Sequence, residues 1–185
     1  GMKDEFNALL PQRQPGGLTA MAGVEVEEYY ALLDPVPVVG NWFTGQSKLW
    51  AERLAVVGDQ KASVIARYGA SNGWLNERIA ITVHPYGKGL VYYVGAYLDA
   101  EAQKSLLERA LKTAGVTSIA TAPGIEICVR TRPDGEKVYI VINHTPEKRV
   151  MHMPWPFYDH LSQAQFSAGV ELVPYGVAVM TQVEA

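Results

Sequence analysis

The sequence predicts a chain in two parts, an α/β domain at residues 1–118 and an all-β domain at residues 119–185. Two observations lead to this prediction. A pair of strand patterns is followed by one clear helical pattern at residues 99–115. Beyond residue 118 there are only short strand patterns separated by turn residues, which is typical of a small antiparallel β-sandwich.

Composition excludes several classes of protein. The 185 residues are 48% hydrophobic and 19% charged, which is typical of a globular chain with a substantial core. The net charge of −3 gives no basic surface for nucleic acid. No apolar run approaches the roughly 20 residues of a membrane span, and no apolar signal segment follows Met2, so a cytoplasmic location is expected. The single cysteine, Cys128, excludes an internal disulfide and a cysteine metal cluster.

Turn residues and hydrophobic periodicity predict the structure of the N-terminal segments. Residues 3–23 predict loops with one short helix, and residues 25–33 predict a strand that passes into a loop. Residues 34–45 contain two prolines and two glycines and are expected to be mostly irregular. Residues 48–57 fit a helix nearly as well as a strand, whereas residues 62–69 favour a strand.

A glycine-rich turn at Tyr86–Gly89, with the sequence YGKG, joins two apolar runs and predicts a β-hairpin. The same letters raise the question of a phosphate-binding loop. Such a loop needs GxxxxGK[ST] between a strand and a helix, but here Lys88 is followed by glycine and a strand pattern. The motif therefore favours a tight turn.

Residues 99–115 form the clearest helix. Asp99 is a good N-terminal cap, and Gly115 suits the left-handed geometry that ends helices. The spacing predicts a single apolar face made of Ala102, Leu106, Leu107, Ala110, Leu111 and Ala114.

The C-terminal part predicts two strands, at 124–132 and 136–145, around the turn Pro133-Asp134-Gly135. Further short strands are expected at RVMHMP, GVELVPYG and VAVMTQ. Side chains alternate along residues 138–143. The face of Val138, Ile140 and Ile142 is expected to be buried, because all three are aliphatic.

The chemistry-bearing residues form no recognisable active site. Cys128 lies within a strand pattern and is expected to be a buried, unreactive thiol. The histidines lack zinc-site spacing, His144 is expected to serve a structural hydrogen bond, and no GxSxG occurs. The adjacent acids Glu27 and Glu28 are expected to be exposed. No catalytic, cofactor-binding or metal-binding residue is predicted; the four histidines are His84, His144, His152 and His160.

The chain is rich in large aromatic residues, with four tryptophans and ten tyrosines. Such side chains serve cores and subunit interfaces, and they also line sugar-binding surfaces. Core or interface is favoured for Trp42, Trp50, Trp74 and Trp155. A face exposing Trp42, Trp74 and Trp155 would instead favour a carbohydrate-binding module.

A series of segments resembles the C-terminal portion of family 42 glycoside hydrolases, the β-galactosidases. The resemblance covers most of residues 15–180. It is carried by PGGLTAMAGVEVEEYYAL, WAERL, ASVIARYG, ITVHPYGKGLVYYVGAYLD, GIEICVRTR, VYIVINHT and VELVPYGVAVM, together with the helix at residues 99–115.

The resemblance implies a fold and a role. In that family a (β/α)8 catalytic barrel precedes a flavodoxin-like trimerisation domain, of the class I glutamine amidotransferase type with a mixed sheet, and a β-sandwich follows. A barrel needs about 250 residues, and nothing here matches the family's catalytic glutamates. Residues 1–118 would therefore be a partial trimerisation domain, in a fragment or a naturally short relative.

The implied function is non-catalytic. The chain would assemble and stabilise an enzyme that hydrolyses terminal β-D-galactosides, would be inactive alone, would need no cofactor, and would form a homo-oligomer, with a trimer as the family's form. Its other partner would be a catalytic barrel. Two alternatives are a free-standing carbohydrate-binding or protein-interaction module, and a small enzyme of amidotransferase descent. The absence of a nucleophile-elbow motif argues against the latter.

Overall fold

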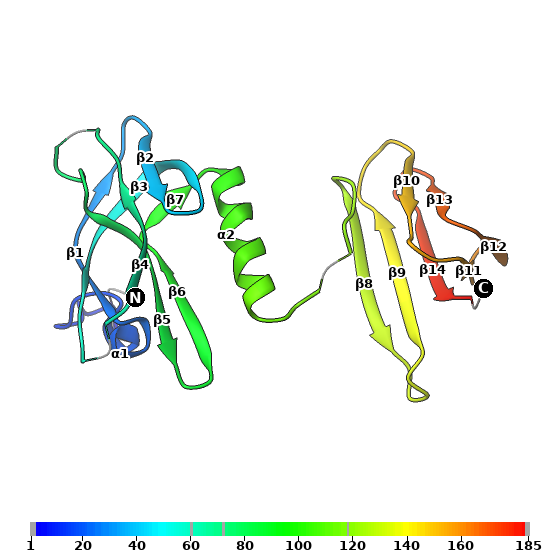
Figure 1. Ribbon diagram of the computed structural model, residues 1–185, viewed down its shortest axis with the longest axis horizontal. Helices are drawn as coiled ribbons and strands as arrows, with labels where there is room; N and C mark the ends of the chain where they lie inside the picture. The colour runs from blue at the N-terminus through cyan, green and yellow to red at the C-terminus, as the bar shows by residue number, and fades with distance from the viewer. Residues whose placement is uncertain (1–2, 60, 72, 118, 184–185) are drawn as a thin grey trace. The chain divides into compact units, whose positions relative to one another are not determined.

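The computed structural model describes residues 3–59, 61–71, 73–117 and 119–183 (Figure 1). The chain divides into two compact units, unit 1 at Gly1–Val116 and unit 2 at Thr117–Ala185. The expected boundary residue, Ser118, lies outside the described residues. That the two units are independent domains stays a prediction.

Unit 1 is built on one antiparallel sheet, in the order β1-β3-β2-β4-β5-β6, with β7 paired to β3. Two short helical turns precede the sheet and one longer helix follows it, beside the strands in Figure 1. The elements are η1 (Gly16–Leu18), α1 (Thr19–Ala22), β1 (Val24–Ala31), β2 (Val36–Gly40), β3 (Thr44–Val56), β4 (Ser63–Tyr68), β5 (Ile79–Tyr86), β6 (Gly89–Val94), β7 (Ala96–Leu98) and α2 (Ala100–Thr113).

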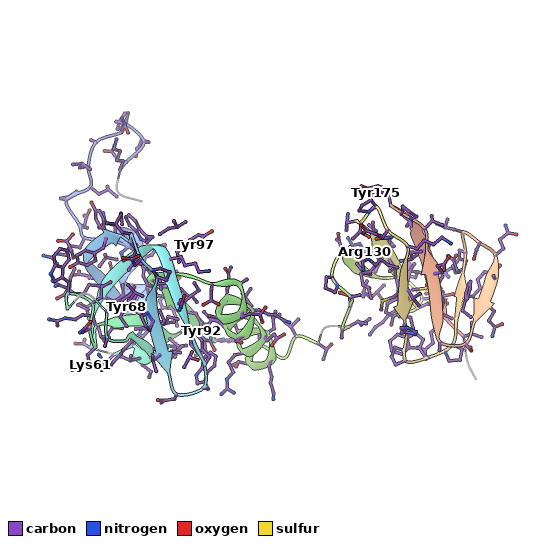
Figure 2. The ribbon with its side chains drawn as sticks, turned by 90° about the horizontal axis from the view of Figure 1, so that it is seen from above. Lys61, Tyr68, Tyr92, Tyr97, Arg130 and Tyr175 are labelled. Carbon is purple, nitrogen blue, oxygen red and sulfur yellow. The ribbon has the colours of Figure 1, made fainter. Side chains whose placement is uncertain are left out.

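The sheet of unit 1 closes on itself through β3, its longest strand. β3 pairs with β2, β2 with β4, β4 with β5, and β5 returns to β3 at Leu54 and Ile79. The closed ring surrounds a core that includes Tyr68, whose hydroxyl lies 2.7 Å from the carbonyl oxygen of Gly95. Burial raises the pKa of Tyr68 above its ordinary value, so the hydroxyl stays a neutral donor. Figure 2 labels Tyr68 among these strands.

The flavodoxin-like part of the fold prediction is not confirmed. That fold has parallel strands with helices on both faces, whereas every strand pair of the described residues is antiparallel. The segment left open between helix and strand is β3, and the segment expected to be irregular contains β2. Gly40 explains in part why the segment of β2 was expected to be irregular. A Cβ there would lie 2.6 Å from the carbonyl oxygen of Ile65, so glycine serves close strand packing.

The predicted hairpin and helix are confirmed. Tyr86 and Gly89 pair around a two-residue turn, and Gly87 has a φ of +57°. The Asp99 carboxylate accepts a hydrogen bond of 3.0 Å from the backbone N–H of Ala102, which caps α2. The YGKG motif is therefore a tight turn between two strands. Phosphate loops instead open a helix.

Replacing Lys88 with alanine is expected to leave the melting temperature within about 3 °C of the parent, because changes at exposed positions rarely exceed about 0.5 kcal/mol. Gly87→Ala in the same turn is the contrasting variant, since a left-handed φ disfavours any Cβ by about 1 kcal/mol. Thermal unfolding followed by circular dichroism measures both. A saturable rise in melting temperature with added phosphate would instead revive the phosphate-loop hypothesis.

The apolar face predicted for α2 is only half covered. Ala102 and Leu106, in the first two turns, are buried in the core of unit 1. Leu107 and Leu111, further along, remain exposed. The helix therefore docks through its N-terminal half and leaves an apolar surface near its C-terminal end.

The described residues of unit 2 form two antiparallel sheets that share one hydrophobic cluster, in agreement with a small β-sandwich. One sheet has the order β12-β11-β14-β9-β8, and the other pairs β10 with β13. β11 and β12 were not predicted. The strands are β8 (Ile125–Thr131), β9 (Lys137–Asn143), β10 (Arg149–His152), β11 (Phe157–Asp159), β12 (Ala164–Phe166), β13 (Gly169–Leu172) and β14 (Val177–Gln182).

The expected orientation of β9 is wrong. Tyr139, Val141 and Asn143 are buried, whereas the aliphatic face of Ile140 and its neighbours is only half buried. Asn143 explains why a polar side chain lies inside. Its amide nitrogen donates to the carbonyl oxygens of Glu147 and Val173, 2.8 and 2.9 Å away. Satisfied hydrogen bonds remove the penalty for burying the amide.

A buried carboxylate organises the turn between β11 and β12. Asp159, at the end of β11, accepts hydrogen bonds from the backbone N–H groups of Leu161, Ser162 and Val179 and from the Ser162 hydroxyl. Burial by itself raises the pKa of Asp159, but these hydrogen bonds outweigh it and hold the pKa below its ordinary value. The folded state therefore favours the charged carboxylate.

Unit 2 is expected to lose stability as the pH falls below about 4. A carboxyl whose pKa is lower in the folded state stabilises above its unfolded pKa, about 3.9, and loses that effect as the pH falls through the folded value. Asp159→Asn should be less stable than the parent at pH 7 and decline less below pH 4. Urea unfolding between pH 2 and pH 7 measures this. Parallel profiles for the two proteins would contradict it.

Candidate interaction surface

The four histidines lie in different segments of the chain, His84 in β5, His152 in β10, and His144 and His160 in the segments that follow β9 and β11. His84 is buried, with Nδ1 2.8 Å from the carbonyl oxygen of Met21, and Nε2 of His160 lies 3.0 Å from the Thr181 hydroxyl. Across the described parts of the chain, no group of three histidine, cysteine or acidic side chains could hold a metal ion.

Cys128 differs from its prediction in burial. It is partly exposed rather than buried, and its thiol donates to the Glu126 carboxylate at 3.2 Å. This hydrogen bond raises the pKa of Cys128, so the group stays a weakly nucleophilic thiol. Nε2 of His144 lies 2.8 Å from the same carboxylate, which agrees with the structural hydrogen bond expected for that histidine.

The sequence favoured a core or an interface position for the four tryptophans, and none of them belongs to the fully buried core. Trp42, Trp50 and Trp74 are all exposed. Trp155 is half buried and packs on Tyr139, with ring centroids 5.6 Å apart. Core burial is therefore excluded for the three exposed tryptophans, and the face of Trp42, Trp74 and Trp155 that would favour a carbohydrate-binding module is not complete, because Trp155 is half buried.

An aromatic row crosses the outer face of unit 1 on β1, β3 and β7. Tyr29 stacks on Trp50, with ring centroids 5.1 Å apart and planes inclined by 17°. Ala51 pairs with Ala96 and both are buried, so their neighbours Trp50 and Tyr97 point to the opposite, outer face. Their exposed fractions are 40% for Tyr29, 39% for Trp50 and 59% for Tyr97. Figure 2 labels Tyr97 at the margin of unit 1.

Leu49, the residue before Trp50, has an apolar side chain that is 67% exposed. It lies in the irregular segment of β3 between Ser47 and Ala51, where the pairing with β7 shifts. Its φ of +61° is unfavourable for a residue with a branched side chain. The backbone thus adopts a strained conformation at a point where it presents leucine to solvent, which is typical of recognition surfaces.

A carboxylate borders the aromatic row. Oε1 of Glu52 accepts a hydrogen bond of 3.3 Å from the Trp50 indole N–H, and Oε2 accepts one of 2.8 Å from the Tyr93 hydroxyl. The Glu52 backbone N–H donates to the carbonyl oxygen of Gly95 at 2.6 Å. Burial, and then the hydrogen bond to Glu52, raises the pKa of Tyr93, which therefore remains a neutral donor.

A hollow of about 790 Å³ lies between the β5–β6 turn and α2. It is lined by Leu90 and Tyr92 from β6 and by the exposed Leu107 and Leu111 from α2. Figure 2 labels Tyr92 near this helix. The hollow is the uncovered half of the helix's apolar face.

These features define a β-rich module with exposed aromatic and apolar surfaces. The family model described as the beta-galactosidase trimerisation domain matches residues 1–117, and the chain belongs to this family. The family resemblance drawn from the sequence is therefore confirmed.

Several curated relatives are β-galactosidases. BglY from Alicyclobacillus acidocaldarius is 34% identical over 190 residues, which cover 97% of this chain and 27% of the relative. LacZ from Heyndrickxia coagulans is 26% identical over 187 residues, covering 100% of this chain and 27% of the relative. The chain thus spans about a quarter of the length of these relatives.

Solved structures agree on the fold. The β-galactosidase from Bacillus circulans sp. alkalophilus superposes with a TM-score of 0.84 at 22% identity, covering 99% of this chain and 28% of that one. Within the described residues, no helix has the length and apolar character that a membrane crossing requires.

Proposed function

We propose that this chain is a non-catalytic part of a family 42 β-galactosidase that assembles the enzyme into a homo-oligomer and stabilises it. The match of residues 1–117 to the trimerisation-domain model carries the proposal. The aromatic row adds physical support, because exposed aromatic side chains supply much of the binding energy of protein interfaces. A trimer is the proposed form, and a cytoplasmic location stays a prediction.

The hollow between β6 and α2 has a different proposed role. We propose that further polypeptide of the parent enzyme, which would also carry a catalytic barrel, covers it. The relatives are nearly four times as long as the matched region, which supplies polypeptide for this contact. Exposed leucines on one helix face are typical of a packing surface whose partner comes from elsewhere in the protein.

The chain is expected to self-associate and to be catalytically silent. Light scattering coupled to size exclusion, over a dilution series, should give about three times the 20.3 kDa mass of one chain. The same fractions should not hydrolyse a chromogenic β-galactoside above background. A single-chain mass at every concentration would contradict the assembly role, and a dimer would contradict the three-fold geometry. Turnover that survives repurification would contradict catalytic silence.

A further inference from the structure

Beside the aromatic row lies a carboxylate that has no basic partner among the residues that the structure describes. In the register of β1 and β3, Tyr29 pairs with Glu52, so both side chains belong to the outer face that carries Trp50. Among the ion pairs of the described residues, Glu52 has no lysine, arginine or histidine partner. Its two hydrogen bonds, from Trp50 and Tyr93, come from neutral donors.

The next residue of β3 forms an ion pair, unlike Glu52. Arg53, the next residue of β3, pairs with Glu27 of β1 at 2.9 Å. Glu27 therefore has a cationic partner within the unit, whereas Glu52 forms no ion pair with the described residues. The indole and phenol groups hold the Glu52 carboxylate in one place and leave its negative charge available.

A fixed carboxylate bordered by aromatic faces is complementary to a cation. Aromatic rings attract ammonium and guanidinium groups through their negative faces. A carboxylate adds charge-assisted hydrogen bonds, which are roughly twice as strong as neutral ones. We propose that the site formed by Tyr29, Trp50, Glu52 and Tyr93 receives a lysine or arginine side chain from a second copy of this chain.

The inference rests on the proposed assembly function, which makes a second copy the partner. The chain itself supplies suitable groups, because several exposed basic side chains of unit 1 lack a carboxylate partner among the described residues. In a ring of three copies, contact joins two different surfaces, so the cation comes from a face other than the aromatic row. Examples of such groups are Arg13, Lys61, Arg78, Lys88, Lys104 and Lys112.

Glu52→Gln tests the site with little change in shape. We expect its self-dissociation constant, measured by sedimentation equilibrium in 0.1 M NaCl, to rise at least tenfold. Glu108→Gln is the matched control, since it removes one exposed negative charge from α2. The control should stay within twofold of the parent. Circular dichroism establishes that both variants fold.

Competition with free arginine is the second measurement. Arginine hydrochloride at 0.2 M should dissociate the parent more than 0.2 M NaCl does, while Glu52→Gln should respond equally to the two salts. Should Glu52→Gln fail to fold, Tyr93→Phe replaces it, because it removes only the hydroxyl that holds the carboxylate; a threefold or greater weakening is expected.

The outcomes separate the inference from the proposed function. Parent and Glu52→Gln chains that associate equally, with no specific effect of arginine, overturn the inference and leave the assembly role intact. A parent chain that is monomeric throughout overturns both.

Discussion

Replacing Gly45 with alanine is expected to destabilise unit 1 by about 3 kcal/mol, near the upper end of the usual range for overpacking. A Cβ at this position of β3 would lie 2.3 Å from the Cβ of Ala102 and 3.1 Å from Oδ2 of Asp99. To relieve the contact, α2 must move away from the strand. That movement strains the cap, because the Asp99 carboxylate accepts from the backbone N–H groups of both Gln46 and Ala102. Urea unfolding measures the loss.

Two further variants make this prediction specific. Gly89→Ala is the matched control, because Gly89 is also in a strand and the atom nearest to an added Cβ would be the carbonyl oxygen of Tyr86, 3.9 Å away. The double variant Gly45→Ala with Ala102→Gly removes the colliding methyl group. It should be more stable than Gly45→Ala alone, although glycine in a helix normally costs about 1 kcal/mol. Additive losses would show that the Gly45–Ala102 contact is not the cause.

The features of unit 1 that the sequence predicted correctly are local ones. The cap at Asp99 and the turn at Gly87 depend on residues within a few positions of each other, and their backbone chemistry is visible in the sequence. Strand β2 is different. Its proline and glycine suggest a loop, yet pairing with β3 and β4 determines its conformation. Such pairing depends on distant residues, which no local pattern contains.

The candidate site could not be predicted from the sequence either, because it also brings together residues that are distant in the chain. Glu52 and Tyr93 are 41 positions apart, and β1 supplies Tyr29 from a third segment. The only signal was the abundance of aromatic residues, which allowed cores, interfaces and sugar-binding surfaces alike. Leu49 gave no signal, because its exposure follows from an irregularity in strand pairing.

The orientation of β9 illustrates a limit of hydrophobic patterning. Both faces of the strand are apolar, since Tyr139 and Val141 alternate with Ile140 and its aliphatic neighbours. Hydrophobicity alone favoured the aliphatic face. The opposite face is inside because Tyr139 packs against Trp155, and because the buried amide of Asn143 connects two loops. The ring contact with Trp155 and the hydrogen bond to Val173, 30 positions along the chain, therefore contribute to the choice of buried face, and neither is visible in the local pattern.

This orientation of β9 predicts that truncating the smaller side chain, Val141, destabilises unit 2 more than truncating the larger one, Ile140. Val141→Ala removes two carbon atoms from a fully buried side chain and is expected to cost about 2–3 kcal/mol. Ile140→Ala removes three carbon atoms from the half-buried face and is expected to cost only about 1 kcal/mol. The smaller deletion should thus be the more damaging one, because it leaves a cavity that water does not fill. The unfolding transition of unit 2 in urea measures both. A larger loss for Ile140→Ala would show that β9 buries its aliphatic face instead.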